Sequence, residues 1–320
     1  MQLLKDILYG VNIKLVTGVT NVEVQSLTFD SRTVVEGSVF FAIKGVARDG
    51  HDFVQDVCDK GCAVVISEKE VEVNEGVQLI VVEDSHKALA IMAGNFFGEP
   101  SKKLKLIGVT GTNGKTTITT LLFNLYSKLG FQCGLISTVV NKICDRDIPS
   151  THTTPDPISL NQLLFDMVEE GVSHCFMEVS SHAIHQNRIA GLTFAGGVFT
   201  NITHDHLDYH KTFKEYINVK KRFFDELPKG AFALTNEDDK NGLVMLQNTK
   251  AKKRTSSLKS MSDYKAKVLE NQFSGLVLLI NGKELWTKLI GDFNAYNLLT
   301  VFGVSQELGE DETEVLTVIS

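Results

Sequence analysis

The segment Gly108-Val109-Thr110-Gly111-Thr112-Asn113-Gly114-Lys115-Thr116-Thr117 has the residue types of a phosphate-binding turn. Glycines let a backbone curl until several N–H groups face one anion, and a following helix adds the positive end of its dipole. Lys115 would bring a positive charge to the outer phosphates, and the Thr116 hydroxyl would be a magnesium ligand. The strict pattern G-x-x-x-x-G-K-[ST] requires glycine where this chain has Val109. The sequence therefore predicts a nucleotide site, and a glycine-rich turn that only caps a helix is the alternative.

Other polar residues follow strand-like runs, and a parallel sheet would bring them to the same edge as this turn. Glu178 is expected to join Thr116 and Thr138 as a hard oxygen ligand of Mg²⁺. Six of the nine histidines fall between residues 174 and 210, and His204-x-His206-x-x-x-His210 also has a spacing that zinc could use. We favour a magnesium-nucleotide role for one of these histidines, because aspartates and the phosphate loop surround them.

Three loops could bind a polar substrate or could be ordinary turns. Thr151-His152-Thr153-Thr154-Pro155-Asp156-Pro157 is rigid and lined with hydroxyls, but Asp156 or the threonines would also suit a helix N-cap. Arg188 could clamp a carboxylate with two hydrogen bonds, or it could be a surface arginine. Near the N-terminus, Asp30-Ser31-Arg32 and Asp49-Gly50-His51 suit a phosphate-bearing ligand, and equally suit caps and turns.

The elements that must position these residues alternate between strand and helix, which predicts an α/β fold. Residues 1–98 should form a small N-terminal α/β domain. Residues 99–320 should form a central phosphate-loop domain whose mostly parallel sheet is flanked by helices. The polar segment Gly98 to Lys103 marks the boundary. Expected strands are 39–43, 63–66, 79–82, 104–109, 134–138, 174–179, 197–200 and 231–234, with a hairpin at 276–286. Expected helices are 52–60, 85–97, 115–129, 158–170 and 213–227, with a last helix from about 293.

Composition excludes several classes of protein. The chain is 43% hydrophobic and 22% charged, and no apolar run approaches the roughly 20 residues of a membrane helix. No signal peptide is visible, and the five scattered cysteines suit reduced thiols, so we expect a cytoplasmic protein without membrane insertion. A net charge of −7 argues against nucleic-acid binding. The basic run Lys250 to Arg254 is interpreted as a solvated surface stretch.

Together these motifs resemble the Mur ligases, the ATP-dependent amide-forming enzymes of peptidoglycan synthesis. The resemblance covers essentially the whole chain, and the family's shortened phosphate loop accounts for the missing glycine at 109. The branch most similar adds the third residue to UDP-N-acetylmuramoyl-L-alanyl-D-glutamate. The motifs that carry this resemblance are Gly111 to Thr117, Thr153-Thr154-Pro155-Asp156, Glu178-Val179-Ser180-Ser181-His182, Asp205-His206-Leu207-Asp208-Tyr209-His210, Asp30-Ser31-Arg32 and Asp49-Gly50-His51.

The resemblance implies a set of residue roles. Lys115, Glu178, His206 and Lys220 are the implied catalytic residues. The implied ATP contacts are Gly111, Thr112, Asn113, Gly114, Lys115, Thr116, Thr117, Asn294 and Asn297. The implied contacts to the UDP-linked substrate are Ser31, His51, Thr153, Thr154, Ser180, Gln186 and Arg188. Magnesium would be held by Thr116, Thr138, Glu178, His206 and, if carbamylated, Lys220; a shift of register to Lys221 stays open.

The implied reaction joins a diamino acid, either meso-diaminopimelate or L-lysine, to the γ-carboxylate of the D-glutamyl residue through an acyl phosphate. The family also has a C-terminal amino-acid-binding domain, which these 320 residues do not include. We therefore expect this chain to bind the UDP-substrate, and ATP weakly, without turnover. Separately, we expect a monomer. The alternatives are a folylpolyglutamate synthetase, a nucleotide-gated regulatory module and a generic phosphate-loop kinase.

Overall fold

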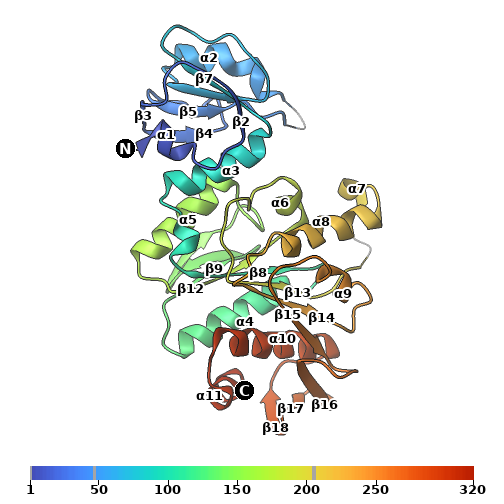
Figure 1. Cartoon of the computed structure of the whole chain (residues 1–320). Helices are drawn as coiled ribbons and strands as arrows, with labels where there is room; N and C mark the ends of the chain where they lie inside the picture. The colour runs from blue at the N-terminus through green and yellow to red at the C-terminus, as the bar shows by residue number, and fades with distance from the viewer. Residues whose placement is uncertain (1, 46–47, 204–206) are drawn as a thin grey trace. The chain divides into compact units, whose positions relative to one another are not determined.

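The computed structural model of the chain describes residues 2–45, 48–203 and 207–320, with no side chains described at 207 and 208 (Figure 1). The chain divides into two compact units. The first comprises residues 1–100, 156–165 and 186–192, and the second comprises residues 101–155, 166–185 and 193–320. In the part that the structure describes, no helix is both long and apolar enough to cross a bilayer. The expected domain boundary at 98/99 stays a prediction.

The first unit is built on a five-stranded sheet in the order β2-β7-β6-β5-β4, in which only β2 runs antiparallel to its neighbour. Apolar side chains pack on both faces of this sheet, and Phe41 and Phe40 lie in the two opposite cores. Its elements are β1 (Gln2–Leu3), α1 (Leu4–Ile7), β2 (Ile13–Thr17), β3 (Glu23–Val24), β4 (Ser26–Thr28), β5 (Ser38–Phe41), η1 (Gly50–Phe53), α2 (Val54–Asp59), β6 (Val64–Ser67), β7 (Gln78–Val82) and α3 (Ser85–Phe96), followed by η2 (Pro100–Lys102).

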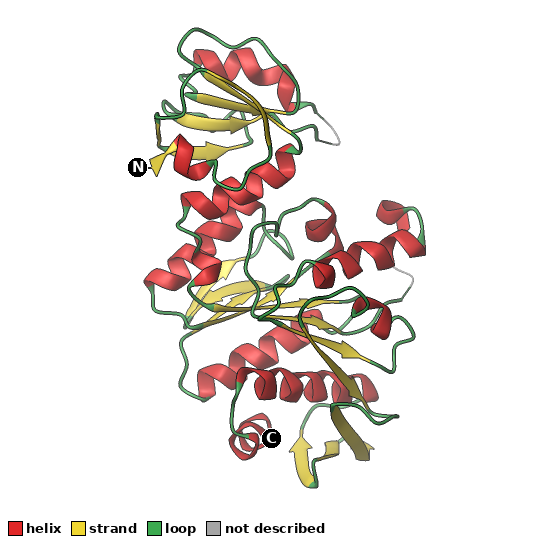
Figure 2. Cartoon of the chain, viewed as in Figure 1, coloured by secondary structure: helices red, strands yellow, loops and turns green. Residues whose placement is uncertain are grey.

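The second unit is built on an eleven-stranded sheet in the order β11-β10-β9-β12-β8-β13-β14-β15-β16-β17-β18 (Figure 2). The pairs from β9 through β16 are parallel, and antiparallel hairpins flank them at both edges. Its strands are β8 (Lys105–Thr110), β9 (Cys133–Ile136), β10 (Val140–Ile143), β11 (Arg146–Pro149), β12 (His174–Glu178), β13 (Gly196–Phe199), β14 (Phe232–Asn236), β15 (Lys252–Ser257), β16 (Tyr264–Gln272), β17 (Gly275–Ile280) and β18 (Lys283–Thr287). Its helices are α4 (Lys115–Lys128), α6 (Ser181–His185), α7 (Leu207–His210), α8 (Phe213–Asp225), α9 (Gly242–Met245), α10 (Asp292–Leu308) and α11 (Glu312–Ile319), and α5 (Pro157–Glu169) crosses from the first unit into the second.

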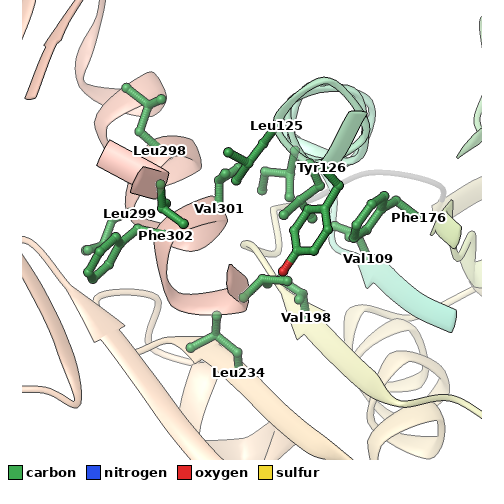
Figure 3. Packing of buried hydrophobic residues seen from close by; sticks show 14 of the residues in the cluster. Val109, Leu125, Tyr126, Phe176, Val198, Leu234, Leu298, Leu299, Val301 and Phe302 are labelled. Carbon is green, nitrogen blue, oxygen red and sulfur yellow. The ribbon is translucent and has the colours of Figure 1, made fainter. Parts of the chain in front are cut away.

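Helices α4 and α10 cover one face of this sheet and enclose a hydrophobic core (Figures 1 and 3). The apolar residues of α4 recur at helical spacing, so one side of the helix meets the sheet. Figure 3 shows side chains from α4, from α10 and from the strands gathered in one core. The labelled residues are Leu125 and Tyr126 from α4, Leu298, Leu299, Val301 and Phe302 from α10, and Val109, Phe176, Val198 and Leu234 from the strands.

Helix α8 covers the opposite face, and glycines in the strands allow its close approach (Figure 1). A Cβ at Gly108 would lie 2.7 Å from Cζ of Phe223, and a Cβ at Gly197 would lie 2.9 Å from Cε1 of the same ring. Gly108 is therefore a packing glycine inside β8. Counting it among the glycines of the phosphate turn was wrong, because alternation along the strand directs this position toward α8.

The expected α/β fold class is confirmed, and the expected elements match the observed ones to within a few residues at each end. The Asn281-Gly282 turn has positive φ at both residues, 51° and 81°, as a tight hairpin requires. Sequence reasoning missed the hairpin of β10 and β11. The lysines of the basic run are exposed, which agrees with its interpretation as a solvated surface stretch. The run lies partly in β15, where Lys252 and Arg254 also pair with the carboxylate of Glu307, at 3.0 and 2.6 Å.

Candidate functional site

The phosphate loop connects the end of β8 to the start of α4 at the carboxyl edge of the parallel strands. Gly111 and Gly114 have φ values of 149° and 90°, which favour glycine. A Cβ at Gly111 would lie 1.9 Å from Oγ1 of Thr200, and one at Gly114 would lie 2.7 Å from Oδ1 of Asn297. Any larger residue at either position would therefore clash with a neighbouring side chain and would also strain the backbone.

The end of the neighbouring strand β13 fixes the shape of this loop. Thr200 Oγ1 donates to the carbonyl oxygen of Asn113 at 2.6 Å, and the Asn113 N–H donates to Oδ1 of Asn201 at 3.0 Å. The Thr112 N–H donates to the carbonyl oxygen of Asn201 at 2.8 Å. The loop conformation is thus held by protein contacts alone, so little ordering remains to be done when an anion binds.

A buried carboxylate lies next to the first turn of α4. Glu178 ends β12, is 1% exposed, and accepts a hydrogen bond from Thr116 Oγ1 at 2.8 Å. Thr138, just past β9, donates to the same carboxylate from its N–H at 2.8 Å and from its Oγ1 at 3.1 Å. The structure thus brings together the three oxygen ligands expected from the sequence, and hard oxygen donors of this kind suit Mg²⁺.

Two lysine ammonium groups converge on one loop oxygen. Lys115 Nζ donates to the carbonyl oxygens of Gly111 and Thr112, at 2.9 and 2.8 Å. Lys220, on α8 and 1% exposed, donates to the same Gly111 oxygen at 3.1 Å. Lys221 instead donates to Asp225 on its own helix at 2.7 Å. Of the two neighbouring lysines, Lys220 is therefore the one that reaches the loop.

The threonine loop lies beside Glu178. Thr154 Oγ1 donates to the Glu178 carbonyl oxygen at 2.8 Å and accepts from the Ser180 N–H at 3.1 Å, while the hydroxyl oxygens of Thr138 and Thr153 lie 3.1 Å apart. Asp156 accepts the N–H groups of residues 158 and 159. It is therefore a helix cap, which was one of the two interpretations of this residue left open by the sequence.

The N-terminal part of α10 also reaches the phosphate loop. Asn297 Nδ2 donates to Oδ1 of Asn294 at 3.1 Å, and Asn294 Nδ2 donates to the carbonyl oxygen of Ile290 at 2.8 Å. Because Asn297 contacts Gly114, this chain of amides connects the loop to the segment that precedes α10. Both asparagines implied as ATP contacts thus lie in the same unit as the loop.

Four implied substrate residues belong to the first unit: Ser31, His51, Gln186 and Arg188. Asp49 accepts the His51 N–H at 3.0 Å and contacts Nδ1 of the same imidazole at 2.5 Å, which fixes the ring. Arg188 donates from Nε and Nη2 to Oε1 of Gln186, at 2.9 and 2.7 Å. Both donors thus share one neutral amide oxygen two residues away, and the clamping of a carboxylate by Arg188 stays a prediction.

The histidines have separate roles. His206 and His204 lie outside the described residues, so the magnesium and zinc interpretations of this run stay open. His210 contacts Ser181 Oγ through Nε2 at 2.9 Å, and His185 contacts the Tyr209 hydroxyl through Nδ1 at 2.9 Å. His174 is buried, and that burial lowers its pKa to about 4, so it is neutral in the folded protein at neutral pH.

Sequence reasoning missed two residues that touch the loop. Thr200 ends the strand-like run 197–200, and its position at a strand end was the only signal for it. Tyr216 comes four residues before Lys220 on α8, and its hydroxyl lies 3.3 Å from Thr112 Oγ1. Helical spacing placed Tyr216 on the face of Lys220, but no pattern in the sequence connected it to the loop.

Comparisons with known proteins agree with this geometry. The chain matches the Mur ligase middle domain over residues 109–305 and the Mur ligase family, catalytic domain, over residues 23–97. It is 55% identical over 319 residues to the UDP-N-acetylmuramoyl-L-alanyl-D-glutamate–2,6-diaminopimelate ligase of Cytophaga hutchinsonii. The matched region covers 99% of this chain and 66% of that protein. The chain thus spans about two thirds of the length of that relative.

Two solved structures show the same fold. A UDP-N-acetylmuramoyl-L-alanyl-D-glutamate–2,6-diaminopimelate ligase is 25% identical, has a TM-score of 0.85, and matches over 99% of this chain and 66% of its own. The MurF ligase of Thermotoga maritima in complex with ADP is 22% identical, has a TM-score of 0.61, and matches over 92% of this chain and 66% of its own. On the family matches and the high identity, this chain belongs to the Mur ligase family.

Proposed function

We propose that this chain takes part in an ATP-dependent ligation that joins 2,6-diaminopimelate to the D-glutamyl γ-carboxylate of UDP-N-acetylmuramoyl-L-alanyl-D-glutamate. The observation that carries the proposal is the buried Glu178 carboxylate, hydrogen-bonded to Thr116 at the start of the phosphate-loop helix. The names of relatives that are 50 to 55% identical favour diaminopimelate over L-lysine, two substrates between which the sequence alone did not decide.

The ligation has two steps. An oxygen of the γ-carboxylate attacks the γ-phosphorus of ATP, the bond from that phosphorus to the bridging oxygen breaks, and ADP leaves with the electron pair. The diaminopimelate amine then attacks the acyl carbon of the resulting acyl phosphate. Inorganic phosphate leaves as the C–N bond forms, and the amine loses its extra proton to solvent. Lys115 and the loop N–H groups lower the repulsion between the two anions in the first step.

Magnesium fits the residues beside the loop, because Thr116, Thr138 and Glu178 offer hard oxygen atoms within hydrogen-bond distance of one another. His206 and a carbamylated Lys220 are the further ligands that we propose. When bound, Mg²⁺ would supply positive charge between the phosphates and the approaching carboxylate. Thr116 and Thr138 keep the Glu178 carboxylate oriented toward the loop.

Carbamylation of Lys220 is supported by its position beside Lys115. Both ammonium groups donate to the Gly111 oxygen, so two like charges lie close together in a buried place. Loss of a proton from Lys220 frees a lone pair that attacks CO₂. The product is a carbamate anion, and a second proton is released. This conversion replaces a repulsive cation with an anionic oxygen ligand for the metal.

The substrate contacts that the family resemblance implies are part of the proposal. Ser31 and His51 would bind the uridine diphosphate, and Gln186 and Arg188, with Thr153, Thr154 and Ser180, would hold the muramoyl-dipeptide. The proposed substrates are made inside cells, which supports a cytoplasmic location. A monomeric state, and binding without turnover by these 320 residues, stay predictions that sedimentation and a phosphate-release assay would decide.

Thermal unfolding with added ligands tests the proposal and separates it from a folylpolyglutamate synthetase. A ligand at 100 times its dissociation constant stabilises the folded state by about 2.7 kcal/mol. We expect Mg-ATP and UDP-N-acetylmuramoyl-L-alanyl-D-glutamate each to raise the midpoint temperature, and a reduced folate to leave it unchanged. Stabilisation by the folate but not by the UDP-dipeptide would overturn the proposal.

A further inference from the structure

Tyr216 is a fully buried residue of α8 that contacts the phosphate loop and Lys220 at the same time. Its hydroxyl lies 3.3 Å from Oγ1 of Thr112, and the exposed fraction of the residue is 0%. Thr112 Oγ1 also accepts the Thr203 N–H at 3.0 Å. The tyrosine hydroxyl is therefore part of the hydrogen-bond network that fixes the loop.

The ring of Tyr216 supports Lys220. The two residues are four apart on α8 and share a face, and Lys220 Nζ lies 4.8 Å from the centre of the ring. His210 stacks on the same ring at 5.1 Å with an angle of 29° between the planes. The head group of Lys220 thus lies between the aromatic ring and the Gly111 oxygen, which it reaches at 3.1 Å.

These contacts connect two consecutive loop residues through one side chain. The hydroxyl of Tyr216 touches Thr112, and its ring positions the lysine that touches Gly111. We propose that Tyr216 is a positioning residue that sets the spacing between the phosphate loop and Lys220 before the nucleotide binds. The inference rests on the proposed function only where it concerns nucleotide binding, because the support of Lys220 is a property of the chain itself.

The two contacts can be separated by substitution. Tyr216→Phe removes the hydroxyl and keeps the ring, whereas Tyr216→Leu removes both. A side chain that only filled the core would not distinguish these variants by function, because its loss would change stability alone. Tyr126→Phe is a matched control: Tyr126 is another fully buried tyrosine, and it packs against Phe131 and His174 at the opposite end of the strands.

Two measurements on the full chain test the inference. The first is the rate at which an amine-acylating reagent labels Lys220 in CO₂-free buffer without any ligand, where this lysine carries a free amine. Mass spectrometry of the peptide follows the reaction. Lys220, which is 1% exposed, should be labelled at the same slow rate in wild type and in Tyr216→Phe. In Tyr216→Leu its labelling rate should be at least tenfold higher. The second is the dissociation constant of Mg-ADP from calorimetry. Tyr216→Phe should weaken it about three- to tenfold, the effect of one neutral hydrogen bond.

Urea unfolding of each variant under the same conditions confirms that the protein measured is folded. Equal Mg-ADP affinity of Tyr216→Phe and wild type, or equal protection of Lys220 in Tyr216→Leu and wild type, overturns the inference. Wild-type chain that binds no Mg-ADP contradicts the proposed function instead, and the labelling result still decides whether the ring positions Lys220. Tyr126→Phe should match wild type in both measurements, and a change there as large as in Tyr216→Phe also overturns the inference.

Discussion

Replacing Glu178 with glutamine tests the metal site without disrupting the fold. Oε1 of Glu178 accepts from Thr116 Oγ1 and the Thr138 N–H, while Oε2 accepts from Thr138 Oγ1. A glutamine can keep all of these contacts, with its oxygen in the first position and its amide donating to the Thr138 hydroxyl. Each bond loses its charge assistance, worth about 1 kcal/mol, and the variant no longer buries a charge. We therefore expect the free energy of unfolding to change by less than about 2 kcal/mol.

Nucleotide binding should change much more. In wild type, Mg²⁺ should raise the affinity for ATP at least tenfold over the value in EDTA, because in our proposal the Glu178 carboxylate would hold the metal beside the phosphates. In Glu178→Gln this gain should fall to less than threefold, with the affinity in EDTA nearly unchanged. Titration calorimetry of both proteins, with Mg²⁺ and with EDTA, measures the four dissociation constants.

The control for this experiment is Glu226→Gln. Glu226 is an exposed carboxylate just past α8 that pairs with Arg222 at 3.8 Å. Its removal should leave all of the constants unchanged. A Glu178→Gln protein that keeps the full magnesium-dependent gain would refute the assignment of this carboxylate as a metal ligand.

Three further predictions concern packing, backbone and pH. Gly108→Ala would place a Cβ 2.7 Å from the Phe223 ring, so urea unfolding should show a loss of about 1 to 3 kcal/mol. Gly111→Ala would place a Cβ 1.9 Å from Thr200 Oγ1 at a φ of 149°, so the Mg-ADP dissociation constant should rise more than tenfold, and calorimetry on folded variant measures it. Burial next to Lys105 lowers the pKa of His174 from 6.5 to about 4, so the unfolded chain gains a proton first as the pH falls. The contribution of His174 to the free energy of unfolding should be fully present above pH 6.5 and should fall by up to about 3 kcal/mol as the pH approaches 4. Urea titrations at several pH values measure this dependence, and His174→Phe should reduce it.

The parts of the site that could be predicted from the sequence are those encoded locally. The turn from Gly111 to Thr117 has its glycines, lysine and threonine within seven residues, so its chemistry can be read without a fold. The position of Glu178 beside the loop could be predicted because this residue ends an apolar strand, and parallel strands end at the same edge of a sheet. These local signals were enough to predict the conformation of the loop, because a phosphate loop is formed by backbone groups and by side chains close in the sequence.

Contacts between distant segments could not be predicted. Thr200 and Tyr216 meet the loop from β13 and α8, and only the strand order β8-β13 and the placement of α8 bring them there. The position of Thr200 at a strand end was its only signal, and Tyr216 had no signal that connected it to the loop.

The ion pairs of the basic run are another contact between distant segments. Like charges in a row are typical of a solvated stretch, but Lys252 and Arg254 share a carboxylate more than 50 residues away, at Glu307. A strand can carry charges when a helix on its face supplies the counter-charge. The sequence signal for that compensation lies in α10, far from the run itself.

The central claim is that the loop from Gly111 to Thr117 and the Glu178 carboxylate hold the phosphates and the metal of one nucleotide. A crystal structure of the chain with ADP and Mg²⁺ tests it most directly. We predict the β-phosphate within hydrogen-bond distance of the loop N–H groups and Lys115 Nζ, and the metal between Thr116 Oγ1 and Glu178. Nucleotide density elsewhere, with the Lys115 ammonium still on the Gly111 and Thr112 oxygens, would contradict the claim.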